Sequence, residues 1–130
     1  MDDDRMEDRQ MHDDASAISD TPQVELPGTA GQVAREKPEL WRTFQALGAA
    51  TGDAGPLDER SRRLVNLALA IGADSEGATH SHARRAVAEG FAADELEHVA
   101  FLAITTLGWP RAIRGLTWVR DVTRGGATRR

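Results

Sequence analysis

Apolar residues recur at helical spacing through the middle and end of the chain, and no segment shows a strand pattern of comparable strength. The first set falls at positions i, i+1, i+4 and i+7 and consists of Leu40, Trp41, Phe44 and Leu47. This spacing predicts an amphipathic helix that ends between Gly48 and Gly52. Pro38 suits its first turn, because the N–H that proline lacks would have no partner there. The pattern therefore predicts ordered structure from about Pro38 onward.

The next predicted helix is apolar on nearly every side. Asp58 is placed to cap it, since a carboxylate there can accept the free N–H groups of the first turn. The apolar residues beyond that turn are Leu64, Val65, Leu67, Ala68, Leu69, Ala70 and Ile71. Gly72 closes the helix. Because it has so few polar positions, we expect it to be the central and most buried helix of the fold.

The third predicted helix covers residues 76–89. It opens at Asp74 or at Ser75, and both residue types accept hydrogen bonds from the first turn of a helix. Gly90 follows as a residue that can adopt the left-handed conformation common after a helix. The sequence therefore predicts a helix of about four turns with a cap at each end.

Two further helices complete the pattern. Asp94 and Glu97 form a capping box, which predicts the start of one helix, and Gly108 ends it. Pro110 lies in the first turn of the last helix. Five helices with short connections are thus assigned, and the chain is predicted to be all-α, a small bundle of about five to six helices.

Composition divides the chain into three segments. Residues 1–34 are rich in Asp, Ser and Gly, which predicts an acidic, flexible arm with a short ordered piece near Val24 and Leu26. Residues 35–124 form the predicted helical domain, and residues 125–130 form a basic tail. A chain of 130 residues has room for one domain, whose core oligomerisation could complete.

The absence of cysteine excludes disulfides, thiolate metal sites and cysteine nucleophiles. The net charge of −5 argues against nucleic acid as a main partner. No apolar run reaches the roughly 20 residues that cross a bilayer, and the acidic N-terminus is unlike a secretory signal. We therefore expect a cytoplasmic protein that acts on a small molecule, without a membrane or nucleic-acid partner.

The polar residues with chemical potential cluster in the third helix. Glu76 and His80 are one helical turn apart and can face the same way. His82 lies about 200° further round the helix than His80, so the two imidazoles should face apart. One is expected to face the protein or a subunit interface and the other water, and the pattern does not say which. A histidine with Arg84 close by predicts an acid–base group beside an anion-binding group.

The same residues also have simpler interpretations. A histidine on a helix is more often a hydrogen-bonded core or surface residue than a catalyst. A metal site needs three or more converging ligands. Glu76 and His80 supply two, and His98 on the next helix would have to supply the third. We therefore predict no metal and no other cofactor.

A series of short motifs follows in order along residues 57–122. It consists of Leu57, Asp58, Arg62 and Leu64, then His82, Arg84, Ala86 and Gly90, then Asp94, Glu95, Leu96 and Val99, and finally Gly108, Pro110 and Ala112. In order and spacing this series resembles the carboxymuconolactone decarboxylase family of the alkylhydroperoxidase D-like superfamily. The resemblance implies the all-α fold of that superfamily, completed by oligomerisation into trimers or into hexamers made from them.

The superfamily has a redox branch that carries a glutamate and then C-x-x-C-x-x-x-H. With the histidine of that motif placed on His82, the two cysteine positions fall on Ser75 and Ala78, and the glutamate falls on Arg63. Neither serine nor alanine can cycle through a disulfide. The chain is therefore predicted to lack thiol peroxidase activity.

The branch without cysteines is similar to this chain around Glu76, His82 and Arg84. It implies a decarboxylase, a carbon–carbon lyase that removes CO₂ from a small carboxylated lactone without a cofactor. In that reading His82 is the acid–base catalyst, and Glu76 pairs with or orients an imidazole, that of His80 or His82. Arg84 or Arg62 holds the anion, because a planar guanidinium pairs bidentately with a carboxylate.

The chain departs from the decarboxylases at one place. They carry tryptophans just ahead of the position of Leu57, where residues 48–52 are small here. Trp41, Trp109 and Trp118 could replace that pocket wall or pack in the core. The alternative is therefore a non-catalytic or accessory helical oligomer of the same fold.

Overall fold

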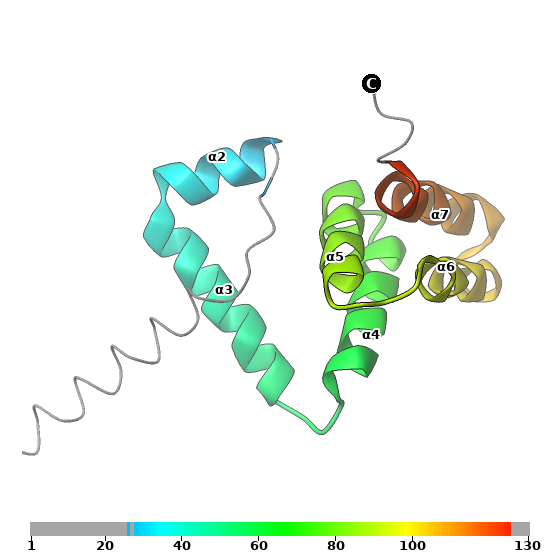
Figure 1. Ribbon diagram of the computed structural model, residues 1–130, viewed down its shortest axis with the longest axis horizontal. Helices are drawn as coiled ribbons and strands as arrows, with labels where there is room; N and C mark the ends of the chain where they lie inside the picture. The colour runs from blue at the N-terminus through cyan, green and yellow to red at the C-terminus, as the bar shows by residue number, and fades with distance from the viewer. Residues whose placement is uncertain (1–25, 27, 126–130) are drawn as a thin grey trace, which may run out of the picture. The chain divides into compact units, whose positions relative to one another are not determined.

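The computed structural model describes Leu26 and residues 28–125, and every regular element within them is a helix. The helices are α2 (Gly28–Glu36), α3 (Pro38–Asp53), α4 (Glu59–Gly72), α5 (Glu76–Ala88), α6 (Ala93–Leu107) and α7 (Trp109–Thr123) (Figure 1). The prediction of an all-α chain is confirmed for this part of it. The helices belong to two compact units, Met1–Pro56 and Leu57–Arg130, which are described separately below. No described helix is long and apolar enough to cross a membrane.

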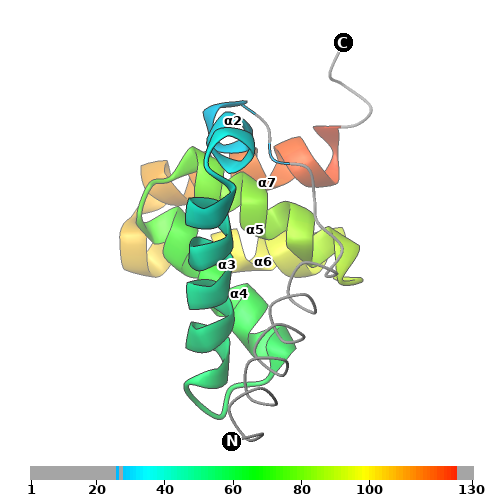
Figure 2. The same ribbon diagram turned by 90° about the vertical axis from the view of Figure 1, so that its left-hand side faces the viewer.

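In the first unit, α2 and α3 are joined at Lys37 and pack against each other (Figure 2). Pro38 is the first residue of α3, as predicted, and the helix continues to Asp53, slightly beyond its predicted end. The prediction that ordered structure starts near Pro38 was wrong, because α2 begins at Gly28, within the range assigned to the arm. This helix is only 9 residues long, and Val33 is its one large apolar residue, so the sequence pattern gave little sign of it. Residues 1–25, with Val24 among them, lie outside the described part.

The second unit contains α4 to α7, and its strongest packing is between α6 and α7. The buried residues of its core come from all four helices and the connection before α6: Leu67, Ile71, Ala83, Ala86, Phe91, Leu96, Val99, Ala100, Leu116 and Val119. Gly115 allows α7 to approach α4 closely, since a Cβ at this position would lie 2.6 Å from Cγ2 of Ile71. The arrangement holds α5 against both α4 and α7, which positions the side chains on two of its faces.

Several predicted helix ends are confirmed. The carboxylate of Asp58 accepts the N–H of Ser61 at 2.7 Å at the start of α4. Of the two candidates before α5, Ser75 is the cap, and its hydroxyl accepts the N–H of Ala78 at 3.2 Å. These ends were predictable because a cap depends on a few neighbouring residues.

The predicted capping box of Asp94 and Glu97 was wrong. Helix α6 begins one residue earlier, at Ala93, and the carboxylate of Glu95 accepts the N–H of Ala92 at 3.0 Å. Glu97 is instead buried and accepts hydrogen bonds from Arg120 at 2.5 Å and Arg124 at 3.0 Å. These charge-assisted bonds lower the pKa of Glu97, that from Arg120 most strongly. A contact between helices thus determined what this glutamate does.

Helix α4 is less buried within its unit than predicted. Leu67, Ala70 and Ile71 are buried, but Val65 is 44% exposed and Leu69 is 65% exposed. The other helices of this unit cover only part of an all-round apolar helix, so they leave one apolar face of α4 uncovered. The expected central position is therefore correct for one face only.

Candidate active site

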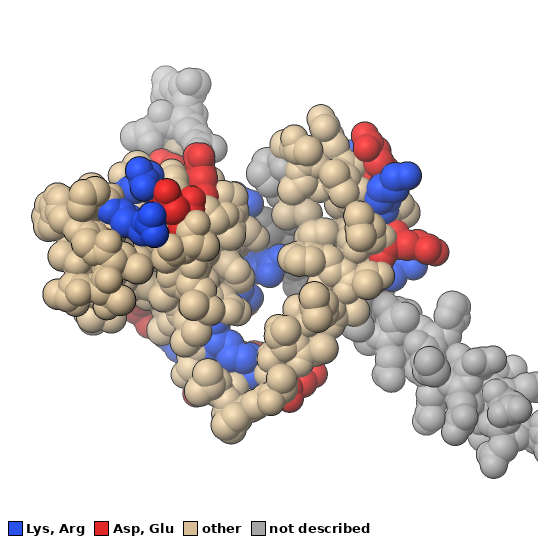
Figure 3. Space-filling model, turned by 180° about the vertical axis from the view of Figure 1, so that it is seen from behind, with Lys and Arg blue, Asp and Glu red and all other residues tan. Residues whose placement is uncertain are grey.

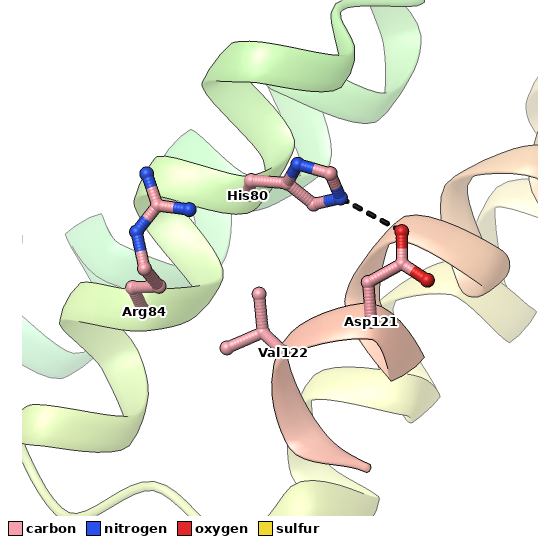
Figure 4. Close-up of a pocket in the computed structure, with 4 residues that line it drawn as sticks. All are labelled: His80, Arg84, Asp121 and Val122. Atoms are coloured by element: carbon pink, nitrogen blue, oxygen red, sulfur yellow. Dashed lines mark hydrogen bonds and ion pairs between the residues drawn. The ribbon is translucent and has the colours of Figure 1, made fainter. Parts of the chain in front are cut away.

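A pocket of about 230 Å³ lies between α5 and α7. Four residues line it: His80 and Arg84 from α5, and Asp121 and Val122 from α7 (Figure 4). Close packing of α5 on α7 brings these residues together although they are about 40 positions apart in the sequence. Three of the four lining side chains are polar or charged, so the pocket is suited to a small polar molecule.

His80 and Asp121 form an imidazole–carboxylate pair. The distance from Nε2 of His80 to Oδ2 of Asp121 is 2.9 Å, and Figure 4 shows the ring turned toward the carboxylate. The side chain of His80 is only 14% exposed, against 34% for Asp121. A carboxylate in this position orients the ring and accepts the Nε2–H, so Nδ1 is left as the nitrogen available to exchange a proton.

Arg84 supplies a cation to the same pocket. It follows His80 by one helical turn and is half-buried. Its Nε is buried and, among the described residues, has no hydrogen-bond partner. An unpaired buried donor costs roughly 1–3 kcal/mol, so an acceptor that reached Arg84 would remove that cost. Arg84 thus places a positive charge in the pocket wall, which suits an anionic ligand.

Glu76 precedes His80 by one turn and is exposed. It forms a cluster with His80 and Asp121, in which one ligand atom of each residue lies within 4.8 Å of the other two. Glu76, His80 and Arg84 thus form one row on α5, at positions i, i+4 and i+8. His80 thus belongs both to the cluster with the two carboxylates and to the pocket wall that Arg84 shares.

His82 lies on another side of α5, toward α4. Its Nδ1 is 2.9 Å from NH1 of Arg63, and Arg63 also makes a bidentate pair with Glu89 at 3.0 Å and 2.7 Å. The pKa of His82 is lowered to about 4, chiefly by burial and then by the positive charges of Arg63 and Arg85, against a smaller opposing effect of Glu89. His82 is therefore a neutral ring near pH 7, and it accepts a hydrogen bond from Arg63.

The structure brings together three of the five residues predicted for the site: Glu76, His80 and Arg84. It does not bring His82 or Arg62 to the pocket, and NH1 of Arg62 instead donates to the carbonyl of Leu57 at 2.6 Å. The two imidazoles face apart, as predicted. The expectation that one of them faces water was wrong, because both are partly buried.

Asp121 was missed by the sequence analysis. One signal for it was available, because it is the single acidic residue in the whole of α7, a helix that carries three arginines. His98, considered above as a third ligand, is exposed on α6 and is not part of the cluster. The position that meets Glu76 and His80 is therefore on the last helix and not on the preceding one.

The positions that the resemblance aligns with the redox residues have other roles here. Ser75 caps α5 by accepting the N–H of Ala78. Arg63, at the position of the redox branch's glutamate, contacts the imidazole of His82. A guanidinium in place of a carboxylate disfavours a proton on that ring. This side of α5 is thus organised around an ion pair.

The model of the carboxymuconolactone decarboxylase family matches residues 38–121, which include all the polar residues of the pocket. An uncharacterized protein of Haemophilus influenzae is 37% identical over 56 residues, which are 43% of this chain and 50% of that protein. The chain thus matches about half the length of this curated relative. No solved structure matches the chain significantly.

Proposed function

The chain belongs to the carboxymuconolactone decarboxylase family, and from this premise we propose that it is a cofactor-free lyase. Its substrate class would be small carboxylated lactones, from which it removes CO₂. The observation that carries the proposal is the pocket between α5 and α7, where the imidazole–carboxylate pair of His80 and Asp121 lies beside the unpaired guanidinium nitrogen of Arg84.

Arg84 binds an anionic group of the substrate in this proposal. A guanidinium bound to the carboxylate that leaves would stabilise the ground state and so oppose the reaction. We therefore assign Arg84 to a carboxylate that stays on the product, where a bidentate pair fixes the orientation of the lactone. The volume of about 230 Å³ is below the roughly 300–1,000 Å³ of sites for drug-sized ligands, which agrees with a small substrate.

His80 handles the proton. When the carbon–carbon bond to the carboxylate breaks, CO₂ leaves and the electron pair passes into the conjugated lactone. A lactone carbon that now carries this electron pair takes a proton, which His80 delivers and then recovers from water. Asp121 holds the ring by accepting its Nε2–H and stabilises the charged imidazolium. Glu76, one turn away and exposed, adds negative charge to the same end of the pocket.

The proposal differs from the sequence expectation in its choice of histidine. His82 was expected to be the acid–base catalyst, and we transfer that role to His80. The reason is that His80 lines the pocket beside Asp121, whereas His82 contacts Arg63, and its pKa is lowered to about 4. Arg84 keeps the expected role of anion holder, and Arg62 does not share it.

The test is conversion of carboxymuconolactone and related carboxylated lactones by the purified protein. Turnover should be lost in His80→Ala and in Asp121→Asn and retained in His82→Ala. A panel of carboxylated lactones in which none is converted would reject the proposal, as would equal activity of wild type and His80→Ala.

A second candidate is a non-catalytic or accessory helical oligomer. It is supported by large apolar side chains that are exposed on α3, α4, α6 and α7, namely Leu40, Phe44, Leu47, Leu69, Leu102 and Trp109. Each is at least 60% exposed, and in Figure 3 residues other than Lys, Arg, Asp and Glu, drawn in tan, cover much of the face in view. Association of subunits would remove such apolar side chains from water, which favours an oligomer.

Light scattering tests this second candidate. A particle several times the 14.1 kDa of the chain, with no turnover on any lactone, is the expected result. A monodisperse monomer would contradict it. Association into trimers or hexamers and a cytoplasmic location are also compatible with the lyase and stay predictions.

A further inference from the structure

We infer that Glu76, His80 and Asp121 bind a divalent transition-metal ion such as Zn²⁺, and that the bound ion blocks the pocket's proton transfer. The binding site stands on the geometry of these three side chains alone. The inhibitory effect rests on the proposed function, because it needs His80 to be the group that moves the proton.

The three side chains converge well enough to share one ion. Their ligand atoms lie within 4.8 Å of one another, and Nε2 of His80 is 2.9 Å from Oδ2 of Asp121. With bonds of about 2.0–2.2 Å, neighbouring donors of a tetrahedral Zn²⁺ are about 3.3 Å apart. The His80–Asp121 distance is close to that value. Glu76 is exposed, so rotation of its side chain can bring its carboxylate in without disturbing the core.

The ligands lie on two helices that pack against each other. Glu76 and His80 are one turn apart on α5, and Asp121 lies on α7, which packs closely against α5. Two ligands at i and i+4 on one helix and a third from its neighbour converge from two directions. The pocket beside them leaves the fourth coordination position to water or to a ligand's oxygen.

The ligand types and charges favour a transition metal. One imidazole and two carboxylates suit Zn²⁺ and its neighbours better than Ca²⁺ or Mg²⁺, which prefer oxygen alone. Among the pocket's lining residues and the three ligands, the carboxylates of Glu76 and Asp121 and the guanidinium of Arg84 are charged. These three charges sum to −1, which favours a cation.

Metal binding and proton transfer exclude each other at His80. The ion would occupy the Nε2 lone pair and the Oδ2 of Asp121, displacing the proton that they share. The other ring nitrogen, Nδ1, then carries the hydrogen of the neutral ring and has no lone pair to accept a proton. A protein loaded with metal should therefore lose its acid–base group while its fold is unchanged.

The experiment is calorimetric titration of the metal-free full chain with Zn²⁺ at neutral pH. Wild type should bind one ion that His80→Ala and Asp121→Asn no longer bind, and Glu76→Gln should bind it about 10-fold more weakly. His98→Ala is the matched control, because it removes an exposed histidine that lies outside the cluster. Residues 1–25 are present in wild type and in every variant, so any Zn²⁺ that they bind contributes equally to all the titrations.

Equal Zn²⁺ binding by wild type and His80→Ala would overturn the inference, as would a loss of binding in His98→Ala alone. If His80→Ala does not fold, two-dimensional NMR of the wild type tests the site without that variant. Adding Zn²⁺ should shift the imidazole signals of His80 and leave those of His98 unchanged. Inhibition is tested separately. Zinc binding without any lactone turnover would reject the proposed function alone, and turnover lost in His80→Ala without any zinc binding would reject this inference alone.

Discussion

Helix α5 carries two histidines, and its two sides give them opposite surroundings. Toward α7, His80 meets the carboxylate of Asp121 at 2.9 Å. Toward α4, Nδ1 of His82 meets the guanidinium of Arg63, also at 2.9 Å. The carboxylate accepts a hydrogen bond from one ring, whereas the guanidinium donates one to the other. The chemistry of each ring is therefore determined by its partner on the neighbouring helix and not by the residue type.

The two sides also differ in how complete their interactions are. On the side of α4, Arg63 is shared between His82 and Glu89, so the cation has a carboxylate partner. On the side of α7, Arg84 has a buried Nε without a partner in the described part of the chain, and a pocket lies next to it. A satisfied network holds two helices together, whereas an unsatisfied group beside a cavity is available to a ligand.

The largest expected effect separates the two histidines by activity. His80→Ala should lower kcat by about 10²–10⁴-fold, the usual range for loss of a general acid–base group. His82→Ala should change kcat by less than 10-fold, because the ring lies outside the pocket. Steady-state kinetics on a carboxylated lactone measure both. The comparison fails if the two variants lose activity equally.

The next effect concerns the two arginines that the sequence proposed as anion holders. Arg84→Gln should raise KM by about 10–100-fold, because it removes a charged hydrogen-bond donor from the pocket. Arg62→Gln is the matched control, since Arg62 donates to the carbonyl of Leu57 and does not line the pocket. The measurement is KM for the lactone. A larger rise in KM for Arg62→Gln would contradict the assignment.

The local part of this arrangement could be predicted from the sequence. Pro38, Asp58 and Ser75 act at helix starts as expected, because each interaction involves residues within a few positions. Glu76 and His80 were also predicted to face the same way, as spacing on one helix decides this. Arg84 was paired with His82, although its spacing of four residues from His80 places it in the other row.

The partners of these side chains could not be predicted in the same way. Asp121 is 41 residues from His80, and Arg63 is 19 residues from His82. No periodicity connects such positions, because the contact depends on how α4, α5 and α7 pack. Glu97 shows the same limit. Its spacing from Asp94 fits a capping box, but its carboxylate accepts hydrogen bonds from Arg120 in α7 and from Arg124, the residue after that helix.

A smaller effect tests the ion pair on the side of α4. Arg63→Met should raise the pKa of His82 toward its ordinary value, because it removes a positive charge next to Nδ1. It should also lower the free energy of unfolding by about 1–2 kcal/mol, since Glu89 loses its partner. Arg114→Met removes a more exposed pair, with Asp74, and should leave the pKa of His82 unchanged. NMR titration of the imidazole and urea unfolding measure the two effects.

The last expected effect is the pH dependence of stability that His82 causes. Its pKa is about 4 in the folded chain and near 6.5 when unfolded, with Arg63, Arg85 and Glu89 as the charged groups around it. Well above pH 6.5 the ring is neutral in the folded and in the unfolded chain, so it does not change the free energy of unfolding. As the pH falls from 6.5 toward 4, only the unfolded chain binds the proton, so stability should decrease across this window. His82→Gln should therefore lose less stability than wild type between pH 7 and pH 5 in urea unfolding. Parallel losses in the two proteins would show that burial and Arg63 together do not keep the ring neutral, and the contrast between the two sides of α5 would then fail.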